Sequence, residues 1–294
     1  MNFEGERVKG QLPLRYEDVA QDGRLVFETI PVGLATIWGK LLATGAEREA
    51  LLSQGVIPIL TRLAIEGGPG PFAMDHPLEV EGGYSLAADV DEGGQVARLL
   101  LDMDASLYGP KGRTNLPPPD DAGTRALAGR VRAEHVFTRP FAPPGERKVV
   151  ALSFGGKPFV PSARRKWRAP ATVLEVPEGA RPLDDAYVDD PARLVLGLTH
   201  TDSNQHVNSL VYPRFFEEAA LRRAAALGRP TSLLARDVEV AYRRPSFAEE
   251  QLRVVLRAFE LGETMLCAGA FFGEGEPTQD LSRARAFIRM TLDA

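Results

Sequence analysis

Three side chains of different chemistry occupy alternate positions in one short polar segment, residues 201–208. Asp202 supplies a carboxylate, Asn204 an amide and His206 an imidazole. A carboxylate can serve as a general base or a nucleophile, an amide can orient a water molecule or hold a carbonyl, and an imidazole exchanges protons near neutral pH. The spacing therefore indicates a site for acid–base or nucleophilic chemistry.

The segments on either side predict how this loop is held. Residues 193–200 have the pattern of a strand and residues 211–227 that of a helix, in which Pro213 is tolerated because it stands in the first turn. The first N–H groups of a helix have no partner within it, so those near residues 209–211 could donate to a negatively charged oxygen. We therefore expect the loop to lie between a strand and a helix N-terminus.

Each of these residues also has an ordinary structural interpretation. Asp, Ser and Asn before a helix are common caps and turn formers, so Asp202 or Ser209 could serve only as a cap. His206 alone could be a loop histidine with no chemical role, and Tyr212 could be a packing residue. The three polar groups together, at this spacing, favour a site.

The composition restricts what else the chain could be. Its 294 residues are 44% hydrophobic and 26% charged, with a net charge of −5, which gives no electrostatic reason to expect nucleic-acid binding. The single cysteine, Cys267, excludes an intrachain disulfide and a cysteine-based zinc site, and the spacing of the histidines predicts no metal. The sequence has no GxGxxG motif after a strand and no P-loop, so we expect no cofactor. The sequence shows neither a signal peptide nor an apolar run of membrane-spanning length, so we expect a cytoplasmic protein that does not enter a membrane.

The chain repeats one order of elements, which indicates two copies of an α+β unit. The first half predicts a strand, a long helix and further strands, at residues 24–30, 34–52, 60–65, 78–87, 96–107 and 128–138. The second half predicts the same order, at residues 194–198, 211–227, 237–242, 251–259, 265–272 and 285–292. Pro71 and Leu78 also have the separation of Pro245 and Leu252, which supports a duplication.

Domain boundaries follow from a Pro-rich stretch between the halves. We predict a first unit at residues 1–139, a linker at 140–190 and a second unit at 191–294, because proline fixes φ and removes a backbone donor. The densest basic segment, Arg164–Arg168, lies in this linker. A solvated charged surface is its ordinary interpretation, and a dock for a phosphate or an acidic carrier protein is the alternative.

The polar loop also resembles a segment of a known family. Residues 202–208, followed by Tyr212 and Glu217, resemble the Asp-x-Asn-x-His-Val-Asn-Asn segment, with its later Tyr and Glu, of acyl-acyl-carrier-protein thioesterases from plants and bacteria. They are similar as well to the Asp-containing loop of 4-hydroxybenzoyl-CoA-type thioesterases. The resemblance implies the hotdog fold, in which an antiparallel sheet wraps a central helix, with two hotdog units in one chain.

The same resemblance implies an enzyme that hydrolyses an acyl-CoA or acyl-carrier-protein thioester. Water would attack the thioester with the help of Asp202, Asn204 and His206. Substrate contacts are expected around the start of the helix and from one tryptophan of the first half: Asn208, Ser209, Tyr212, Glu217 and Trp38. Because the first half has no counterpart of the polar loop, we expect one active site per chain, formed by the second unit against the first, in a monomeric pseudo-dimer or a homodimer.

One departure from the plant family leaves other functions open. There, the strand that reads Tyr-Arg-Arg continues with an acid and a cysteine that are proposed catalytic partners, whereas here residues 242–244 continue with Pro245 and Ser246. Cys267 is expected to be an inert core residue. A hotdog dehydratase or acyltransferase acting on an acyl thioester, or an acyl-binding protein without catalysis, therefore remains an alternative.

Overall fold

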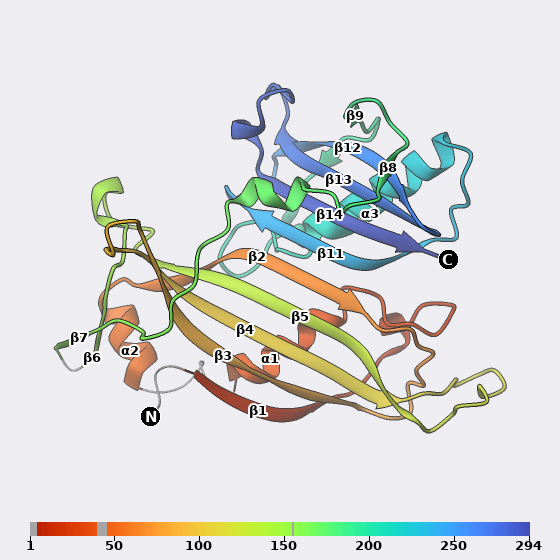
Figure 1. Ribbon diagram of the computed structural model, residues 1–294, viewed down its shortest axis with the longest axis horizontal. Helices are drawn as coiled ribbons and strands as arrows, with labels where there is room; N and C mark the ends of the chain where they lie inside the picture. Colours follow the sequence, from red (N-terminus) through yellow and green to blue (C-terminus); the bar gives the residue numbers. More distant parts are fainter. Residues whose placement is uncertain (1–4, 40–45, 155) are drawn as a thin grey trace. The chain divides into compact units, whose positions relative to one another are not determined.

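The chain folds into two compact units, Met1–Arg168 and Ala169–Ala294 (Figure 1). The computed structural model of the protein describes residues 5–39, 46–154 and 156–294. Each unit contains an antiparallel sheet with a helix on one face, which confirms the predicted α+β class. In the described part of the chain, no helix is long and apolar enough to cross a membrane.

The first unit is built on an antiparallel sheet with the strand order β1-β3-β4-β5-β2. Its strands are β1 (Gly5–Leu12), β2 (Ile57–Gly67), β3 (Leu78–Val90), β4 (Val96–Pro110) and β5 (Arg125–Thr138). The strands predicted to follow the helix of this half correspond to β2–β5 and are confirmed. The structure adds β1, an edge strand that the sequence patterns did not indicate.

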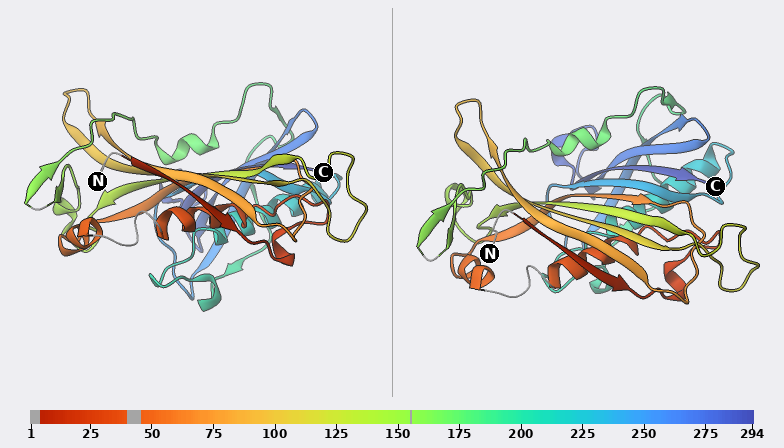
Figure 2. Two further views of the ribbon diagram at one scale, coloured as in Figure 1. Left: turned by 90° about the horizontal axis from the view of Figure 1, so that it is seen from below. Right: turned by 60° about the horizontal axis from the view of Figure 1, so that its bottom comes forward.

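A short helix, α1 (Gly33–Ile37), packs on one face of this sheet, against β1, β3 and β4. The turned views in Figure 2 show it beside the long, twisted strands. Ile37 is fully buried at this contact, and Gly82 of β3 allows the close approach. A Cβ atom on this glycine would lie 2.6 Å from the Cδ1 atom of Ile37, so a larger residue would push the helix away from the sheet.

Two predicted elements of this unit differ from what the structure shows. The helix predicted at residues 34–52 is seen as α1 and α2 (Ala46–Ser53), and residues 40–45 lie outside the described residues. The strand predicted at residues 24–30 is wrong, because this segment makes consecutive backbone turns in which Leu25 forms an isolated bridge. Its alternating apolar side chains are buried in an irregular segment, a pattern that burial alone produces as readily as strand pairing.

The other face of this sheet carries a buried and a partly buried carboxylate that bind Arg165 of the basic segment Arg164–Arg168. Asp102 and Glu134 stand opposite each other on β4 and β5, and Arg165 forms ion pairs with both, at 2.8 Å and 2.5 Å. Burial raises the pKa of Asp102, although the charge of Arg165 opposes this shift. Arg165 therefore has a structural role, because both of its ion-pair partners lie in the sheet of the first unit.

The stretch at residues 140–190, expected to link the units, is divided between them. In the first unit it forms a small hairpin, β6 (Leu152–Phe154) with β7 (Lys157–Phe159). In the second unit it begins with a 3-10 helix, Pro170–Leu174, whose Val173 is fully buried. Apolar residues of this stretch thus contribute to the cores of the units.

The second unit has an antiparallel sheet with the strand order β11-β14-β13-β12-β10. Its strands are β10 (Leu194–Val195), β11 (Leu234–Tyr242), β12 (Gln251–Leu261), β13 (Thr264–Gly273) and β14 (Ala286–Asp293). Two short segments, β8 (Arg181–Pro182) and β9 (Val188–Asp189), also pair with β12. The strands predicted after the helix of this half correspond to β11–β14 and are confirmed.

The central helix of this unit, α3 (Val211–Ala226), lies on one face of the sheet, against β11, β12 and β14. The helix predicted at residues 211–227 is confirmed to within one residue. Phe216 is fully buried, and a Cβ atom on Gly269 of β13 would lie 2.9 Å from its ring. Val173 packs on the opposite face of the sheet, so both faces are covered by apolar residues.

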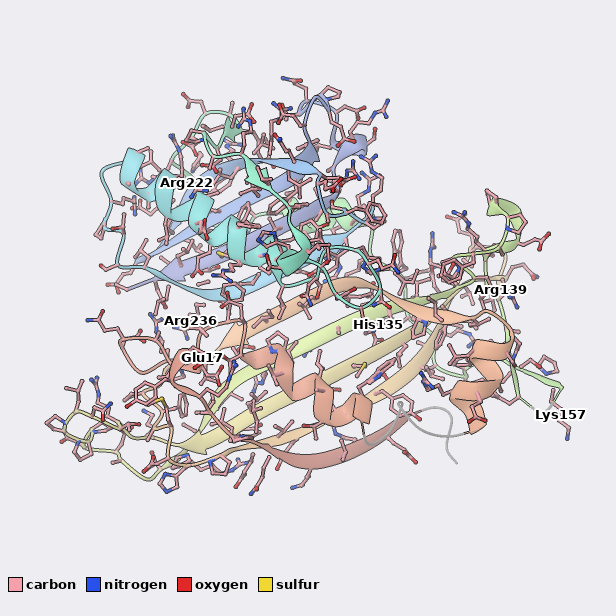
Figure 3. The ribbon with its side chains drawn as sticks, turned by 180° about the vertical axis from the view of Figure 1, so that it is seen from behind. Glu17, His135, Arg139, Lys157, Arg222 and Arg236 are labelled. Atoms are coloured by element: carbon pink, nitrogen blue, oxygen red, sulfur yellow. The ribbon has the colours of Figure 1, made fainter. Side chains whose placement is uncertain are left out.

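Two ion pairs connect the C-terminal half of α3 to the segment that precedes β10. Arg222, labelled in Figure 3, donates two hydrogen bonds to Asp190, at 2.9 Å and 2.7 Å. Its neighbour Arg223 binds Asp184, which also accepts from the backbone N–H of Ala258 at 2.8 Å. Both carboxylates are almost completely buried and paired, a geometry that fixes the helix against β12.

Candidate active site

The polar loop lies between a 3-10 turn and the start of α3. The strand predicted at residues 193–200 is shorter in the structure, because β10 ends at Val195 and residues 198–200 form the turn. The N–H of Gly197 donates to Nδ1 of His200 at 2.9 Å, which closes this turn and ends strand pairing. The loop thus follows a turn, whereas its position before a helix is as predicted.

Asp202 and His206 lie side by side because the loop folds back on itself. Thr201 and Val207 form an isolated antiparallel bridge, and the N–H of Asp202 donates to the carbonyl of His206 at 3.0 Å. Gln205 completes the turn with a φ of 67°, in the left-handed region. The Nδ1 atom of His206 is 3.7 Å from Oδ1 of Asp202, which is longer than a hydrogen bond but short enough for a direct electrostatic interaction.

The two carboxylate oxygens of Asp202 have different surroundings. Oδ1 accepts from the backbone N–H of Asn204 at 2.8 Å, so Asp202 does form the turn that its residue type favours. Among the described residues, none donates a hydrogen bond to Oδ2. The side chain of Asp202 is 29% exposed and that of His206 is 43% exposed, which leaves both accessible to water or a ligand. The turn-forming interpretation of Asp202 is therefore confirmed, and its chemical role stays a prediction.

Asn208 forms the turn that directly precedes α3, whose N-cap residue is Leu210. Its side-chain Oδ1 accepts from the N–H of Leu210 at 2.9 Å, and its carbonyl accepts from the N–H of Val211 at 3.1 Å. Its own N–H donates to the carbonyl of His200 at 2.9 Å, which ties the helix start to the 3-10 turn. Asn208 therefore has a structural role, with the side-chain amide nitrogen left for other contacts.

Two further backbone donors lie at the start of α3, the N–H groups of Ser209 and Tyr212. Within the described part of the chain, their N–H groups form no hydrogen bond. The carbonyl of Ser209 accepts from the hydroxyl of Tyr242 at 2.9 Å, and Tyr212 packs edge-on against Phe271 with ring centroids 5.3 Å apart. Burial raises the pKa of both tyrosine hydroxyls, so they stay protonated and hold the helix start in place.

The loop is also bound to a distant turn, which sequence reasoning missed. The N–H of Val207 donates to the carbonyl of Ser246, a fully buried residue after β11, at 2.8 Å. Both partners are backbone atoms, so neither residue type marks the contact in the sequence. The backbone carbonyl of Ser246 therefore makes the link to the loop.

Glu217 and Trp38, also expected to contact substrate, have other surroundings. Oε1 of Glu217 accepts from the backbone N–H of Ala235 at 2.9 Å, next to a bulge in β11. Trp38 lies in the first unit, directly after α1, and is 40% exposed. A role of either residue in binding stays a prediction. Among the described residues, no group of three His, Cys, Asp or Glu side chains could hold a metal ion.

One segment of the second unit matches a known family model. Residues 204–272 match the model of the thioesterase superfamily. This match includes His206, all of α3 and the strands β11 and β12. No curated protein sequence matches the chain.

Three solved structures match nearly the whole chain. A putative oleoyl thioesterase from Lactobacillus plantarum gives a TM-score of 0.59 at 13% identity, covering 100% of this chain and 97% of that one. An acyl-ACP thioesterase from Bacteroides thetaiotaomicron gives 0.56 at 15% identity, covering 98% of each chain. The 12:0-ACP thioesterase from Umbellularia californica gives 0.54 at 12% identity, covering 97% and 96%. The chain therefore has the double hotdog fold, and the predicted resemblance to these proteins is confirmed.

Proposed function

We propose that this protein is an acyl thioester hydrolase with its active site at the loop of the second unit. The observation that carries the proposal is the placement of Asp202 beside His206, directly before the first turn of a buried central helix. The match of residues 204–272 to the thioesterase superfamily supports it, because the matched segment contains His206 and the whole of α3.

The groups at the loop fit the steps of thioester hydrolysis. Asp202 accepts a proton from a water molecule oriented by Asn204, and the water oxygen attacks the thioester carbonyl carbon. The N–H groups of Ser209 and Tyr212 are candidates to stabilise the resulting oxyanion. When the tetrahedral intermediate collapses, the carbon–sulfur bond breaks and the leaving thiolate takes a proton from the imidazolium of His206. Asp202 then passes the proton that it took from water to His206, which restores both groups. The products are a carboxylic acid and a free thiol.

The carrier of the acyl group is proposed from the fold comparisons. Two of the three whole-chain structural matches are named as acyl-ACP thioesterases, which supports an acyl-carrier-protein substrate over acyl-CoA. Asn208, Glu217 and Trp38 remain proposed substrate contacts, and the side-chain nitrogen of Asn208 is the group of these best placed beside the loop.

Release of free thiol from a panel of acyl thioesters tests this function. The purified full chain is incubated with acyl-CoA and acyl-carrier-protein substrates of several acyl lengths, and products are followed by thiol titration and mass spectrometry. We expect hydrolysis, with carrier-protein substrates preferred. Formation of an enoyl product from a 3-hydroxyacyl thioester would instead identify a dehydratase. Tight binding of every substrate without turnover would identify an acyl-binding protein and overturn the proposal.

A further inference from the structure

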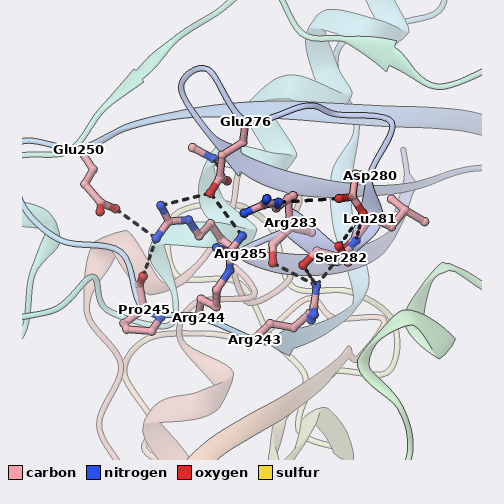
Figure 4. Close-up of polar contacts among 12 residues, drawn as sticks. Arg243, Arg244, Pro245, Glu250, Glu276, Asp280, Leu281, Ser282, Arg283 and Arg285 are labelled. Atoms are coloured by element: carbon pink, nitrogen blue, oxygen red, sulfur yellow. Dashed lines mark hydrogen bonds and ion pairs between the residues drawn. The ribbon is translucent and has the colours of Figure 1, made fainter.

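An arginine outside the polar loop is connected to it by hydrogen bonds through a turn. Arg285, directly before β14, donates from Nη1 to the carbonyl of Pro245 at 3.0 Å. The next carbonyl along the chain, that of Ser246, accepts from the N–H of Val207. Because Val207 follows His206 directly, a short path of contacts leads from the guanidinium group to the imidazole (Figure 4 shows its first part).

Two carboxylates orient the guanidinium group of Arg285. Its Nη1 lies 3.7 Å from Oε2 of Glu250, and its Nη2 lies 3.6 Å from Oε1 of Glu276. Glu276 is itself fixed by the N–H of Gly273 at 2.7 Å. The side chain of Arg285 is only 18% exposed, so these interactions are screened less than those of an open surface pair. A planar guanidinium held at several points has a defined direction, which a flexible ammonium would lack.

The turn that Arg285 binds, residues 245–250, supports the loop region at more than one point. The N–H of Glu249 donates to the carbonyl of Leu196 at 2.7 Å, and the N–H of Leu196 donates to the carbonyl of Glu250 at 3.0 Å. Together with the bond from Val207, these contacts join the turn to both ends of the segment that contains Asp202 and His206. Displacement of the turn would therefore move the loop as a whole.

We propose that Arg285 is a positioning residue of the active site, which holds the turn at residues 245–250 so that His206 is presented correctly beside Asp202. The inference rests on the proposed function. It gives the residues Pro245 and Ser246 a use through their carbonyls, at the positions where the plant family has an acid and a cysteine. Arg285 acts through the backbone and takes no part in proton transfer.

Steady-state kinetics of Arg285→Gln against Arg289→Gln provide the first test. Arg289 stands on β14, shortly after Arg285, and pairs with Glu239 at 2.9 Å, so it is a matched control for loss of a paired arginine. We expect Arg285→Gln to lower kcat about 10–100-fold with KM changed less than about threefold, because misplacement of catalytic groups affects the chemical step. Arg285→Lys should be intermediate, and Arg289→Gln should keep both constants.

Hydrogen exchange at the Val207 amide provides a second test that needs no turnover. In Arg285→Gln we expect this amide to exchange about tenfold faster, with the amides of α3 unchanged. Unchanged exchange at Val207, or faster exchange with an unchanged kcat, would overturn the proposal. If the wild-type protein shows no turnover, the proposed function fails, while faster exchange at Val207 would still support the role of Arg285 in holding the loop. If Arg285→Gln does not fold, Glu250→Gln replaces it, because this variant removes one of the carboxylates that orient Arg285. The same two measurements, kcat and exchange at Val207, then test the proposal.

Discussion

The imidazole Nδ1 of His206 lies 3.7 Å from the carboxylate Oδ1 of Asp202, in a loop that closes by a hydrogen bond between the backbones of the same two residues. This distance exceeds that of a hydrogen bond, so the two side chains interact with each other only electrostatically. Asp202 is held by the N–H of Asn204 as well, so its position does not depend on the imidazole. The carboxylate is thus held by the backbone of the loop, whereas no hydrogen bond to the imidazole is found among the described residues.

Replacing Asp202 by Asn should abolish most of the proposed activity without unfolding the loop. We expect kcat/KM to fall about 100-fold or more, because an amide cannot accept a proton from water. The side-chain oxygen can still accept from Asn204, so the Tm should change by no more than about 2–4 °C. His206→Gln should cause a similar loss, and the double variant should lose little more than either single one, because the groups act as a unit.

Ser203→Ala is the control for these variants, since Ser203 is an exposed residue of the same loop. It should keep wild-type kinetics. Thermal melts and steady-state rates of all four variants give the comparison. Wild-type turnover in Asp202→Asn would remove the carboxylate from the mechanism.

Asp184→Ala should strongly destabilise the second unit. The carboxylate of Asp184 binds both Arg223 and the backbone N–H of Ala258, so its loss leaves a poorly exposed arginine and a buried donor without their partner. We expect the free energy of unfolding to fall by about 3 kcal/mol. Urea unfolding monitored by circular dichroism measures the change. The adjacent Asp185 is exposed, and Asp185→Ala should change the stability by less than about 0.5 kcal/mol. Equal stability of both variants would contradict the structure of this contact.

The thiol of Cys267 should be unreactive in the folded protein. Cys267 is fully buried in β13, and burial raises the pKa of its thiol to about 12, so the thiolate is scarcely populated at neutral pH. Iodoacetamide at pH 8 should label it only after unfolding, as followed by mass spectrometry. Cys267→Ala should retain thioester hydrolysis. Rapid labelling of the native protein, or loss of activity in the folded variant, would show that the cysteine has a role that its burial does not allow.

His135 of β5, labelled in Figure 3, should make the first unit less stable in mild acid. Burial lowers its pKa from 6.5 to about 4, so the unfolded chain binds more protons than the folded one between these pH values. The free energy of unfolding should therefore fall by about 2–3 kcal/mol as the pH decreases from 6.5 to 4. Above pH 6.5 His135 is neutral in both states, so none of this stability is lost there.

His135→Leu should show a flatter pH dependence of Tm in this window. His76 is exposed beside Asp75, and His76→Gln should keep the wild-type dependence. Thermal melts at pH values from 4 to 7 compare the three proteins. Identical pH profiles for wild type and His135→Leu would show that another group is responsible.

Most of the fold could be predicted because its signals are local. The strands β2–β5 and β11–β14 carry apolar alternation or short apolar runs between turn residues, and α3 carries a helical pattern of aromatic residues and alanines. The segment at residues 24–30 carries the same alternation and makes turns instead, since a strand forms only where a partner is available. The sequence could not show that partner. The edge strand β1 was missed for the opposite reason, because its pairing with β3 needs no apolar pattern.

The sequence by itself determined which chemical groups the site offers: Asp202, Asn204 and His206 stand in one short loop before a helix. Only the tertiary structure decided how they are held. Neither Ser209 nor Asn208 caps the helix, because Leu210 is its N-cap residue and Asn208 closes the turn before it. Val207 is bound to the carbonyl of Ser246 from a turn far along the chain. The reason is physical. Side-chain types and local spacing are written in the sequence, whereas a hydrogen bond between two backbone groups can be made by nearly any residue and depends on where folding places them.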